Sequence, residues 1–358
     1  PEIDVVVRGE GERTLTELVQ NAHNKSAFPK IQGMSFRHKG QIVHSPDRPL
    51  IEDLEGLPFP GYHLVKDTVD KYHFAAMAGP KTHYALVEGS RGCLHSCTFC
   101  TQWRHWRRKW RVKSPRRIAD EMAFCYYNYG SRFIWLTDDN LGAGNRVKEV
   151  ADEIVQKGFP DDLMWFVQAR CDDVVRNEKV LPLLRKSGLR WVLLGVESPR
   201  ESTLDDFKKD MTYEDAKKAV RLLKENDIAA HTMFIIGERK DTAESIAHLR
   251  EFVNELDPDF AIFTILTPFP GTEIYDEAKT NGWIKDANWS HYDMAHAIMP
   301  TETLTANEVQ EELYLCYRSF YGSWKRRLQG IFSRSELRRR VYWYMAGRGI
   351  VEQFKTLF

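Results

Sequence analysis

The sequence has no surplus of charge of either sign, since 51 Lys and Arg residues balance 51 Asp and Glu residues. It has no apolar run near the ~20 residues that a membrane-spanning helix needs. No charged segment followed by an apolar one opens it, so nothing predicts secretion, and we expect a cytoplasmic protein. It has no Gly-x4-Gly-Lys-Ser/Thr loop, and Gly9-x-Gly11 and Gly142-x-Gly144 lack a third glycine in register. Neither nucleotide nor dinucleotide phosphate binding is therefore predicted.

The chain has 358 residues, of which 42% are hydrophobic and 12% aromatic. This is enough for about two domains with a large core, and it excludes a disordered chain. The first residue is Pro1, followed at once by a strand-like stretch, and we expect an upstream part to be missing. Although the net charge is zero, two segments are strongly basic. Residues 101–117 contain eight Lys/Arg and no Asp/Glu, and residues 317–358 contain ten Lys/Arg and two Asp/Glu.

Six strand-like apolar runs alternate with helical patterns between residues 82 and 290. Their composition is typical of parallel strands covered on both faces. Such a succession of βα units fits either an open doubly wound sheet or a barrel. Polar residues follow nearly every strand, as at the catalytic end of a barrel. The prediction is therefore an α/β fold with a six-stranded partial (β/α)6 barrel. The runs are 84–87, 133–136, 164–167, 191–196, 232–236 and 260–266.

The flanking regions read differently. Residues 1–23 predict one βα unit of a separate sheet domain, and the proline-rich residues 24–81 predict an irregular linker. Residues 291–358 predict a helical, basic and aromatic region. Its tryptophans and arginines suit either a plain surface helix or peripheral contact with an anionic membrane.

Three of the six cysteines, Cys93, Cys97 and Cys100, lie within eight residues, shortly after the first barrel strand. Thiolates at this spacing indicate a soft or borderline metal. A zinc site would need a fourth ligand, such as His95 or His105. A four-iron cluster usually takes four cysteines, and here three would leave one iron open to a small molecule.

The spacing Cys-x3-Cys-x2-Cys, with Phe99 before the last cysteine, resembles the signature of the radical S-adenosylmethionine (SAM) superfamily. The resemblance implies a 4Fe–4S cluster on Cys93, Cys97 and Cys100, with SAM bound to the fourth iron. It also implies an external one-electron reductant of the flavodoxin or ferredoxin type, and a 5′-deoxyadenosyl radical as hydrogen abstractor. A non-catalytic zinc or iron–sulfur module is the alternative of a different class.

The same resemblance implies the SAM-binding residues. The family commonly has Gly-Gly-Glu after its second strand, where it supports the SAM amino group. Here Asp138, Asp139 and Asn140 occupy that place and are expected to take the same role. The alternative is a loop with a helix cap and no contact with SAM. Gln168 and Arg170 end the third strand, and Glu197 ends the fourth, where a carboxylate after an apolar run needs a partner or a polar cavity. Gly237 is expected to pass close to the adenine, and Phe99 to flank it.

Finer features resemble one branch of the family. Val7-Arg-Gly-Glu-Gly-Glu12 resembles the end of a cobalamin-binding domain, although the cobalt-ligating Asp-x-His-x-x-Gly element is absent. Together with Tyr317-Arg-Ser-Phe-Tyr321 and residues 101–108, it resembles the anaerobic magnesium-protoporphyrin IX monomethyl ester cyclases. Cobalamin-dependent radical C-methylation is the alternative.

The cyclase resemblance implies an anionic tetrapyrrole substrate. We expect Trp103, Arg104, Arg107 and Arg108 to bind such a flat anion by stacking and by guanidinium–carboxylate pairing. A solvated basic helix is the alternative, and nucleic-acid binding is not expected because no known nucleic-acid-binding fold accompanies the segment. His231 is expected either to reach the substrate or to be a hydrogen-bonded core histidine.

Overall fold

The computed structural model describes residues 3–79 and 82–357. Its largest part is a sheet of six parallel strands whose order in space is their order in the chain. A doubly wound sheet would reverse the order at an internal switch point. The continuous order is that of a barrel, so the predicted six-stranded partial barrel is confirmed. The strands are β4 (Tyr84–Val87), β7 (Phe133–Leu136), β8 (Met164–Arg170), β9 (Leu189–Glu197), β10 (Ala229–Ile236) and β11 (Phe260–Ile265).

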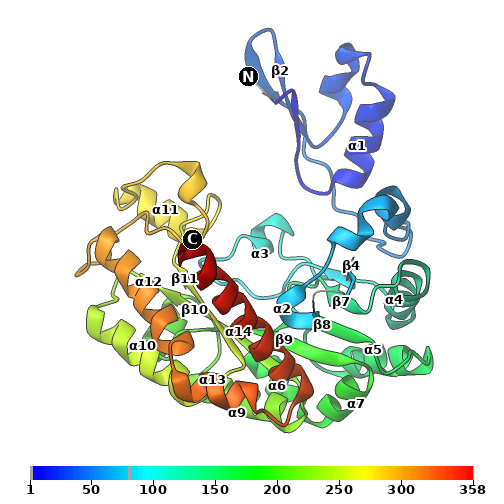
Figure 1. Cartoon of the computed structure of the whole chain (residues 1–358). Helices are drawn as coiled ribbons and strands as arrows, with labels where there is room; N and C mark the ends of the chain where they lie inside the picture. The colour runs from blue at the N-terminus through cyan, green and yellow to red at the C-terminus, as the bar shows by residue number, and fades with distance from the viewer. Residues whose placement is uncertain (1–2, 80–81, 358) are drawn as a thin grey trace.

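The connecting helices cover the outer face of this sheet (Figure 1). Ser114, Thr212, Thr242 and Thr272 cap four of them through their side chains. The helices are α4 (Pro115–Tyr129), α5 (Asn145–Gln156), α6 (Cys171–Arg176), α7 (Leu181–Lys186), α8 (Glu201–Asp206), α9 (Tyr213–Glu225), α10 (Ala243–Leu256) and α11 (Glu273–Thr280), with the 3-10 turns η3 (Glu178–Val180) and η4 (Trp289–His291).

The two faces of each strand have different surroundings. On β9, Val192, Leu194 and Val196 face outward into the main core with the helices. Trp191 faces inward, and with Phe133, Phe166 and Phe260 it belongs to a second, aromatic cluster at the amino ends of the strands. Met77 of α2 (Ala75–Ala78) and Val341 of α14 (Glu336–Leu357) pack on this cluster. That end of the barrel is therefore filled, and a ligand would have to use the opposite end.

The sheet is open, since no pairing joins β4 to β11 among the residues that the structure describes. Tyrosine hydroxyls cover both free edges. On β11, the Tyr321 hydroxyl accepts from the Ala261 N–H (3.1 Å) and donates to its carbonyl (2.8 Å), and Tyr317 does the same at Phe263 (3.3 and 3.0 Å). On β4, the Tyr62 hydroxyl accepts from the Leu86 N–H (2.5 Å) and donates to the Leu86 carbonyl (3.2 Å). These contacts satisfy edge groups that would otherwise be available to another strand.

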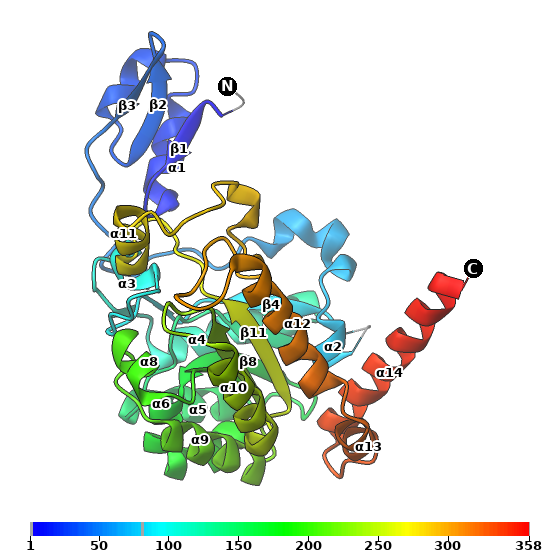
Figure 2. The same cartoon turned by 90° about the vertical axis from the view of Figure 1, so that its left-hand side faces the viewer.

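The spacing of the two helical tyrosines explains why they match the strand. Both belong to α12 (Ala306–Tyr321), one turn apart, or about 6 Å along the axis. Alternate residues of a strand are about 6.8 Å apart, so the two hydroxyls reach alternate residues of β11. After α12 come α13 (Trp324–Ile331) and α14, which extends away from the barrel (Figure 2). The predicted helical C-terminal region is thus present. None of the helices in the described ranges is long and apolar enough to cross a bilayer.

The N-terminal unit stands apart from the barrel in both views (Figures 1 and 2). The predicted strand and helix are present as β1 (Val5–Val7) and α1 (Gly11–Gln20). The predicted irregular linker is wrong for part of its length: after η1 (Lys25–Lys30), the hairpin β2 (Met34–His38) and β3 (Gln41–His44) pairs antiparallel with β1. The unit therefore extends beyond residue 23 to His44. Its turn, Lys39–Gly40, has positive φ at both residues, as a two-residue hairpin turn of type I′ requires. The rest of the predicted linker contains η2 (Tyr62–Lys71) and α2.

Candidate functional site

A short hairpin holds the loop that carries the three clustered cysteines. Its strands β5 (Ser90–Arg91) and β6 (Arg111–Val112) pair antiparallel, and α3 (Gln102–His105) lies within the loop between them. Gly92 is required at the start of the loop because its φ is +101° and an added Cβ would lie 2.0 Å from the Lys109 carbonyl oxygen. The loop is therefore fixed at its base, immediately before Cys93.

Inside the loop, the backbone around Cys97 is held by several contacts. The Trp103 indole N–H and the Cys100 N–H both donate to the Cys97 carbonyl, at 3.0 and 3.1 Å. The Thr98 N–H donates to the Phe207 carbonyl at 3.1 Å, which ties the loop to the chain after α8. Cys97 is buried, whereas Cys93 and Cys100 are half-buried.

The surroundings of the thiols decide what they can bind. Burial raises the pKa of each of the three, that of Cys100 to about 11, while Lys209 and Arg170 partly offset the rise at Cys97. The described residues contain no group of three His, Cys, Asp or Glu side chains arranged around one ion. Three cysteine thiolates from one loop are the donor set of iron–sulfur clusters, so these residues fit such a cluster by their chemistry.

Glu197 lies in a buried ion pair that the sequence did not reveal. Its carboxylate is 2.6 Å from the Lys209 Nζ, and both residues are buried. Burial by itself lowers the pKa of Lys209, but the charges of Glu197 and Cys97 outweigh it, and the pKa is raised. An added Cβ at Gly195 would lie 2.5 Å from the carboxylate and 2.7 Å from the ammonium, so glycine makes room for the pair. Lys209 is a site residue that the prediction missed.

The three polar residues after β7 have different surroundings. Asp138 is fully buried, and its two oxygens accept from the Gly89 N–H (2.7 Å), the Ser90 N–H (3.0 Å) and the Ser90 hydroxyl (2.6 Å). Burial raises its pKa to about 6 against these bonds. A carboxylate so enclosed fixes the turn after β4, which argues against the expected contact with SAM.

Asp139 and Asn140 lie nearer the loop. Asp139 accepts from the Gly92 N–H at 3.2 Å, and burial raises its pKa. Asn140 donates to Asp173 at 2.6 Å and accepts from the Arg170 N–H at 3.3 Å. With Cys93, His95 and others, Asn140 lines a cavity of about 670 Å³. This cavity is the hollow in the described structure that touches both a clustered cysteine and the residues after β7.

Arg170 and Phe99 extend this polar region. The Arg170 guanidinium is bound by Asp172 (2.9 Å) and by the carbonyl of Lys209. Phe99 packs edge-on against Phe207 at 5.0 Å, and the Lys209 Nζ lies 6.0 Å from its ring. Gly237 has a φ of +79°, and an added Cβ there would meet Val309 of α12 at 3.0 Å; its expected approach to adenine stays a prediction.

The inward-facing side chains form the half-exposed part of the sheet. Alternate residues on the strands are intermediate in exposure while their neighbours are buried; they include Trp135, Gln168, Leu193, His231, Met233 and Ile262. This pattern indicates a mostly apolar inner wall, the lower part of which packs on the aromatic cluster: the His231 ring lies 5.6 Å from that of Phe260. His231 is not the hydrogen-bonded core histidine considered from the sequence, because its buried Nδ1 has no partner among the described residues. Burial lowers the pKa of His231 to about 4, so the imidazole is neutral at physiological pH.

The basic segment after the cysteines differs from its predicted role. The Trp103 ring is buried, and the guanidinium carbons of Arg104 and Arg108 lie 5.1 and 4.7 Å from its centre. Arg104 also pairs with Asp276 (3.5 Å), and Arg107 binds the Arg48 carbonyl (3.2 Å). A macrocycle cannot stack on a ring already covered by two guanidinium groups. The prediction that this segment binds a flat anion is therefore not supported by the geometry.

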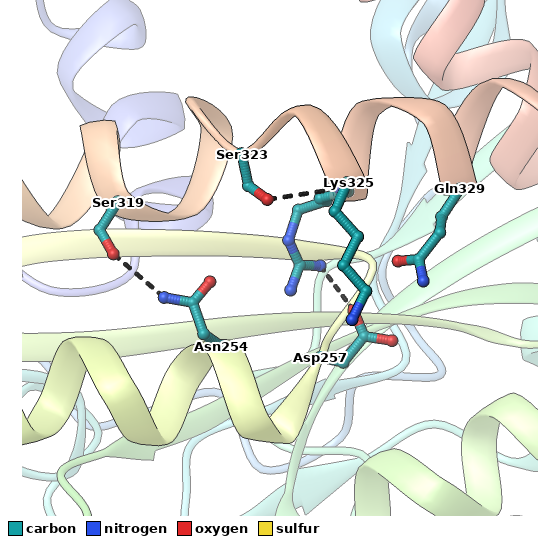
Figure 3. Close-up of a pocket in the computed structure, with 7 residues that line it drawn as sticks. Asn254, Asp257, Ser319, Ser323, Lys325 and Gln329 are labelled. Atoms are coloured by element: carbon teal, nitrogen blue, oxygen red, sulfur yellow. Dashed lines mark hydrogen bonds and ion pairs between the residues drawn. The ribbon is translucent and has the colours of Figure 1, made fainter.

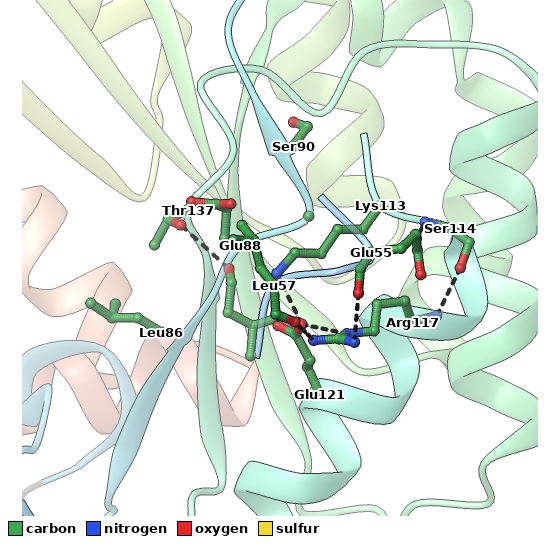
Figure 4. A network of polar contacts seen from close by, with 12 residues as sticks. Glu55, Leu57, Leu86, Glu88, Ser90, Lys113, Ser114, Arg117, Glu121 and Thr137 are labelled. Carbon is green, nitrogen blue, oxygen red and sulfur yellow. Dashed lines mark hydrogen bonds and ion pairs between the residues drawn. The ribbon is translucent and has the colours of Figure 1, made fainter. Parts of the chain in front are cut away.

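Farther along the segment, the basic side chains form ion pairs inside the protein. Glu121 of α4 is fully buried and accepts from Lys113 (2.9 Å) and Arg117 (2.7 Å), as Figure 4 shows. Arg117 also donates to the Leu57 carbonyl at 2.7 Å. This half of the segment anchors the chain before the barrel to α4.

A buried carboxylate of the N-terminal unit holds both strands of the cysteine-loop hairpin. Glu10 accepts from Arg91 of β5 at 2.6 Å and from Arg111 of β6 at 2.8 Å, and its second oxygen accepts from the Ile51 N–H at 2.6 Å. Burial alone would raise the pKa of Glu10, but these hydrogen bonds outweigh it and the pKa is lowered. We call Glu10, Arg91 and Arg111 the hairpin clasp.

Comparison with known proteins gives consistent results. A model of the radical SAM superfamily matches residues 87–253. An uncharacterized methyltransferase of Pyrococcus horikoshii is 32% identical over 90% of this chain and 68% of its own length. The anaerobic magnesium-protoporphyrin IX monomethyl ester cyclase of Cereibacter sphaeroides is also 32% identical, over 90% of this chain and 52% of its own.

Among solved structures, the cobalamin-dependent SAM radical enzyme OxsB matches with a TM-score of 0.71 at 16% identity, covering 98% of this chain and 56% of that one. This likeness supports the fold. The chain thus spans about half of the cyclase and two thirds of the methyltransferase.

Proposed function

Because the chain belongs to the radical SAM superfamily, we propose that Cys93, Cys97 and Cys100 hold a 4Fe–4S cluster at which SAM is cleaved reductively. The observation that carries this proposal is the set of three thiols in one fixed loop. The other three cysteines, Cys125, Cys171 and Cys316, are buried in α4, α6 and α12. When bound, the cluster supplies the electron that breaks the sulfonium C–S bond and gives a 5′-deoxyadenosyl radical.

The chain's own residues would orient SAM and exclude water. Lys209 and Arg170 are buried cations beside Cys97, each paired with a carboxylate of the chain, and their charges favour the Cys97 thiolate that would bind iron. Asp139 and Asn140 add carboxylate and amide groups beside the loop. Gln168 and His231, on the inner wall, would contact the part of the substrate that enters the barrel. Leu193, Met233 and Ile262 would keep that region apolar.

For the substrate, we propose a tetrapyrrole, on which the protein would act as a cyclase of the anaerobic magnesium-protoporphyrin type. The 32% identity to the Cereibacter sphaeroides cyclase supports this, and the apolar inner wall suits a large hydrophobic ring system. The proposal does not depend on Trp103, whose ring is covered.

Radical C-methylation has similar support, from the Pyrococcus horikoshii methyltransferase at the same identity. Cobalamin as an additional cofactor is likewise a proposal, drawn from OxsB. This sequence lacks the Asp-x-His-x-x-Gly element, so its residues offer no cobalt ligand of that kind, and no step is assigned to cobalamin.

The cluster proposal is tested by anaerobic reconstitution with iron and sulfide, followed by incubation with SAM and a reductant. We expect about four irons and four sulfides per chain, and release of 5′-deoxyadenosine. The Cys97→Ala variant should lose both, while Cys125→Ala, at a buried helical thiol, should keep both. Stoichiometric zinc without sulfide, or wild-type 5′-deoxyadenosine from Cys97→Ala, would contradict the proposal.

The substrate proposal needs a second experiment. The reconstituted protein is incubated with magnesium-protoporphyrin IX monomethyl ester and with SAM that carries an isotopic label in its methyl group. Cyclisation gives a product that has lost hydrogen, has gained one oxygen atom from water and carries no label. Transfer of the label to the product identifies a methyltransferase instead.

A further inference from the structure

The polarity of α13 is the reverse of that of an ordinary surface helix. Trp324, Leu328 and Phe332 are spaced by one turn, and 73%, 53% and 77% of their surfaces are exposed. We call these three residues the α13 face. Arg326, on the opposite side of the helix, is buried. A surface helix normally buries its apolar stripe and exposes its charges.

Contacts on the inner side fix this orientation. The Arg326 guanidinium pairs with Asp257 (2.8 Å), donates to the Pro258 carbonyl (3.0 Å) and lies 3.8 Å from the centre of the Phe320 ring. Figure 3 shows α13 above α10, with Asp257 beneath it. An added Cβ at Gly330 would lie 2.1 Å from the Tyr342 ring, so α13 packs directly on α14 there. The helix cannot rotate to bury its apolar residues without breaking these contacts.

Cations surround the α13 face. Lys325, Arg327 and Arg334 are exposed and form no ion pair in the described structure. The Arg327 guanidinium lies 5.4 Å from the centre of the Trp324 ring. The sequence has no Asp or Glu between Ser319 and Ser335. The face is therefore apolar and aromatic at its centre, and the exposed charged residues beside it on the same stretch of chain are cations.

We propose that the α13 face binds the surface of an anionic lipid bilayer. Trp and Phe side chains suit the boundary between headgroups and acyl chains, and Lys and Arg at the border attract anionic headgroups. A polar groove of about 570 Å³ lies on the α10 side of α13 and is lined by Ser319, Ser323 and Lys325 together with Asp257, so its one carboxylate makes it no part of the proposed lipid contact (Figure 3). A two-fold dimer through this face would bring two sets of cations together, so self-association is disfavoured.

The test is flotation of the whole protein with lipid vesicles. We expect it to float with vesicles that contain phosphatidylglycerol, but not with pure phosphatidylcholine. Replacing Trp324, Leu328 and Phe332 together by Ser should abolish flotation, because they supply the apolar contact. The matched control replaces Leu64 and Trp289, 80% and 65% exposed elsewhere, by Ser, and should float normally. Lys325→Gln and Arg327→Gln should each weaken vesicle affinity about fivefold.

The remaining outcomes decide against the proposal. All substituted apolar residues are more than half exposed, so circular dichroism should show that the variants fold. If the triple variant fails to fold, the single variant Trp324→Ser tests the face instead. Equal flotation of the triple variant and its control, or equal binding to neutral vesicles, would overturn the proposal. So would a concentration-dependent dimer, seen by light scattering, that the triple variant abolishes, because the face would then contact a second copy.

Discussion

The hairpin clasp predicts that a residue far from the cysteines in the chain controls the rigidity of their loop. The change is Glu10→Gln. It removes the negative charge between Arg91 and Arg111 and places an amide N–H₂ among groups that donate. Arg91 keeps Glu12 and Glu88 as partners (2.5 and 2.8 Å). Arg111 keeps the Ile51 carbonyl and the face of the Trp106 ring, 5.4 Å from its guanidinium carbon, so it becomes a buried cation without a carboxylate among the described residues.

Breaking a buried ion pair in this way costs roughly 3–5 kcal/mol. Glutamine retains one acceptor oxygen, so we expect about 3 kcal/mol for Glu10→Gln. The loop between β5 and β6 opens locally, and hydrogen exchange of residues 92–110 reports that opening. Since each 1.4 kcal/mol is tenfold, exchange there should accelerate by roughly a hundredfold.

The control is Glu12→Gln. The Glu12 carboxylate is exposed at 37% and touches Arg91 alone, so its loss should cost about 0–1 kcal/mol. A double variant, Glu10→Gln with Arg111→Gln, should lose less than the sum of the two single changes, because it leaves no unpaired cation. If Glu10→Gln exchanges no faster in residues 92–110 than Glu12→Gln, the clasp does not hold the loop.

Three further predictions follow from contacts described above. Tyr321→Phe leaves the Ala261 N–H and carbonyl without their partner and should lower the free energy of unfolding, measured by urea titration, by about 1–3 kcal/mol. The control Tyr314→Phe, at an exposed position of α12, should lower it by less than about 0.5 kcal/mol. Gly92→Ala should prevent retention of iron after reconstitution, because the added methyl group would collide with the Lys109 carbonyl oxygen. The control Gly144→Ala, also at positive φ but in open space, should retain iron. Equal iron contents of the two variants would refute the close approach at Gly92. The pKa of His231 is lowered from 6.5 to about 4, so the unfolded chain takes up the proton at a higher pH than the folded one. The free energy of unfolding should therefore fall as the pH is lowered from 6.5 to 4. His231→Gln should remove that part of the pH dependence, and a variant with the same dependence as the wild type would contradict the assignment.

Local patterns in the sequence were sufficient for the barrel. The six apolar runs became the six strands, because a parallel strand covered on both faces must be apolar throughout. Ser114, Thr212 and Thr242 belong to the residue types that favour helix caps, and a capping side chain acts within three residues, so their role is local in the sequence. The cysteine triplet was readable for the same reason, as its chemistry lies within eight residues.

The missed features depend on partners distant in the chain. Glu10 lies 81 residues from Arg91 and 101 from Arg111, and no local pattern marks the three as partners. Lys209 follows Glu197 by 12 residues, across α8, and looks like an ordinary surface lysine in the sequence. Trp103 and its arginines were correctly recognised as unusual, but their burial against Cys97 could not be derived from composition.

The hydroxyl caps on β4 and β11 make the two borders of the open side of the barrel independent of each other. Two strands that pair with each other must keep a common register along their whole length. A tyrosine that meets one residue of an edge strand imposes no such condition on the opposite border. Tyr62 and the pair on α12 therefore satisfy the two borders separately, each through the backbone of its own strand. A change of residue at one border leaves the hydrogen bonds of the other border as they are.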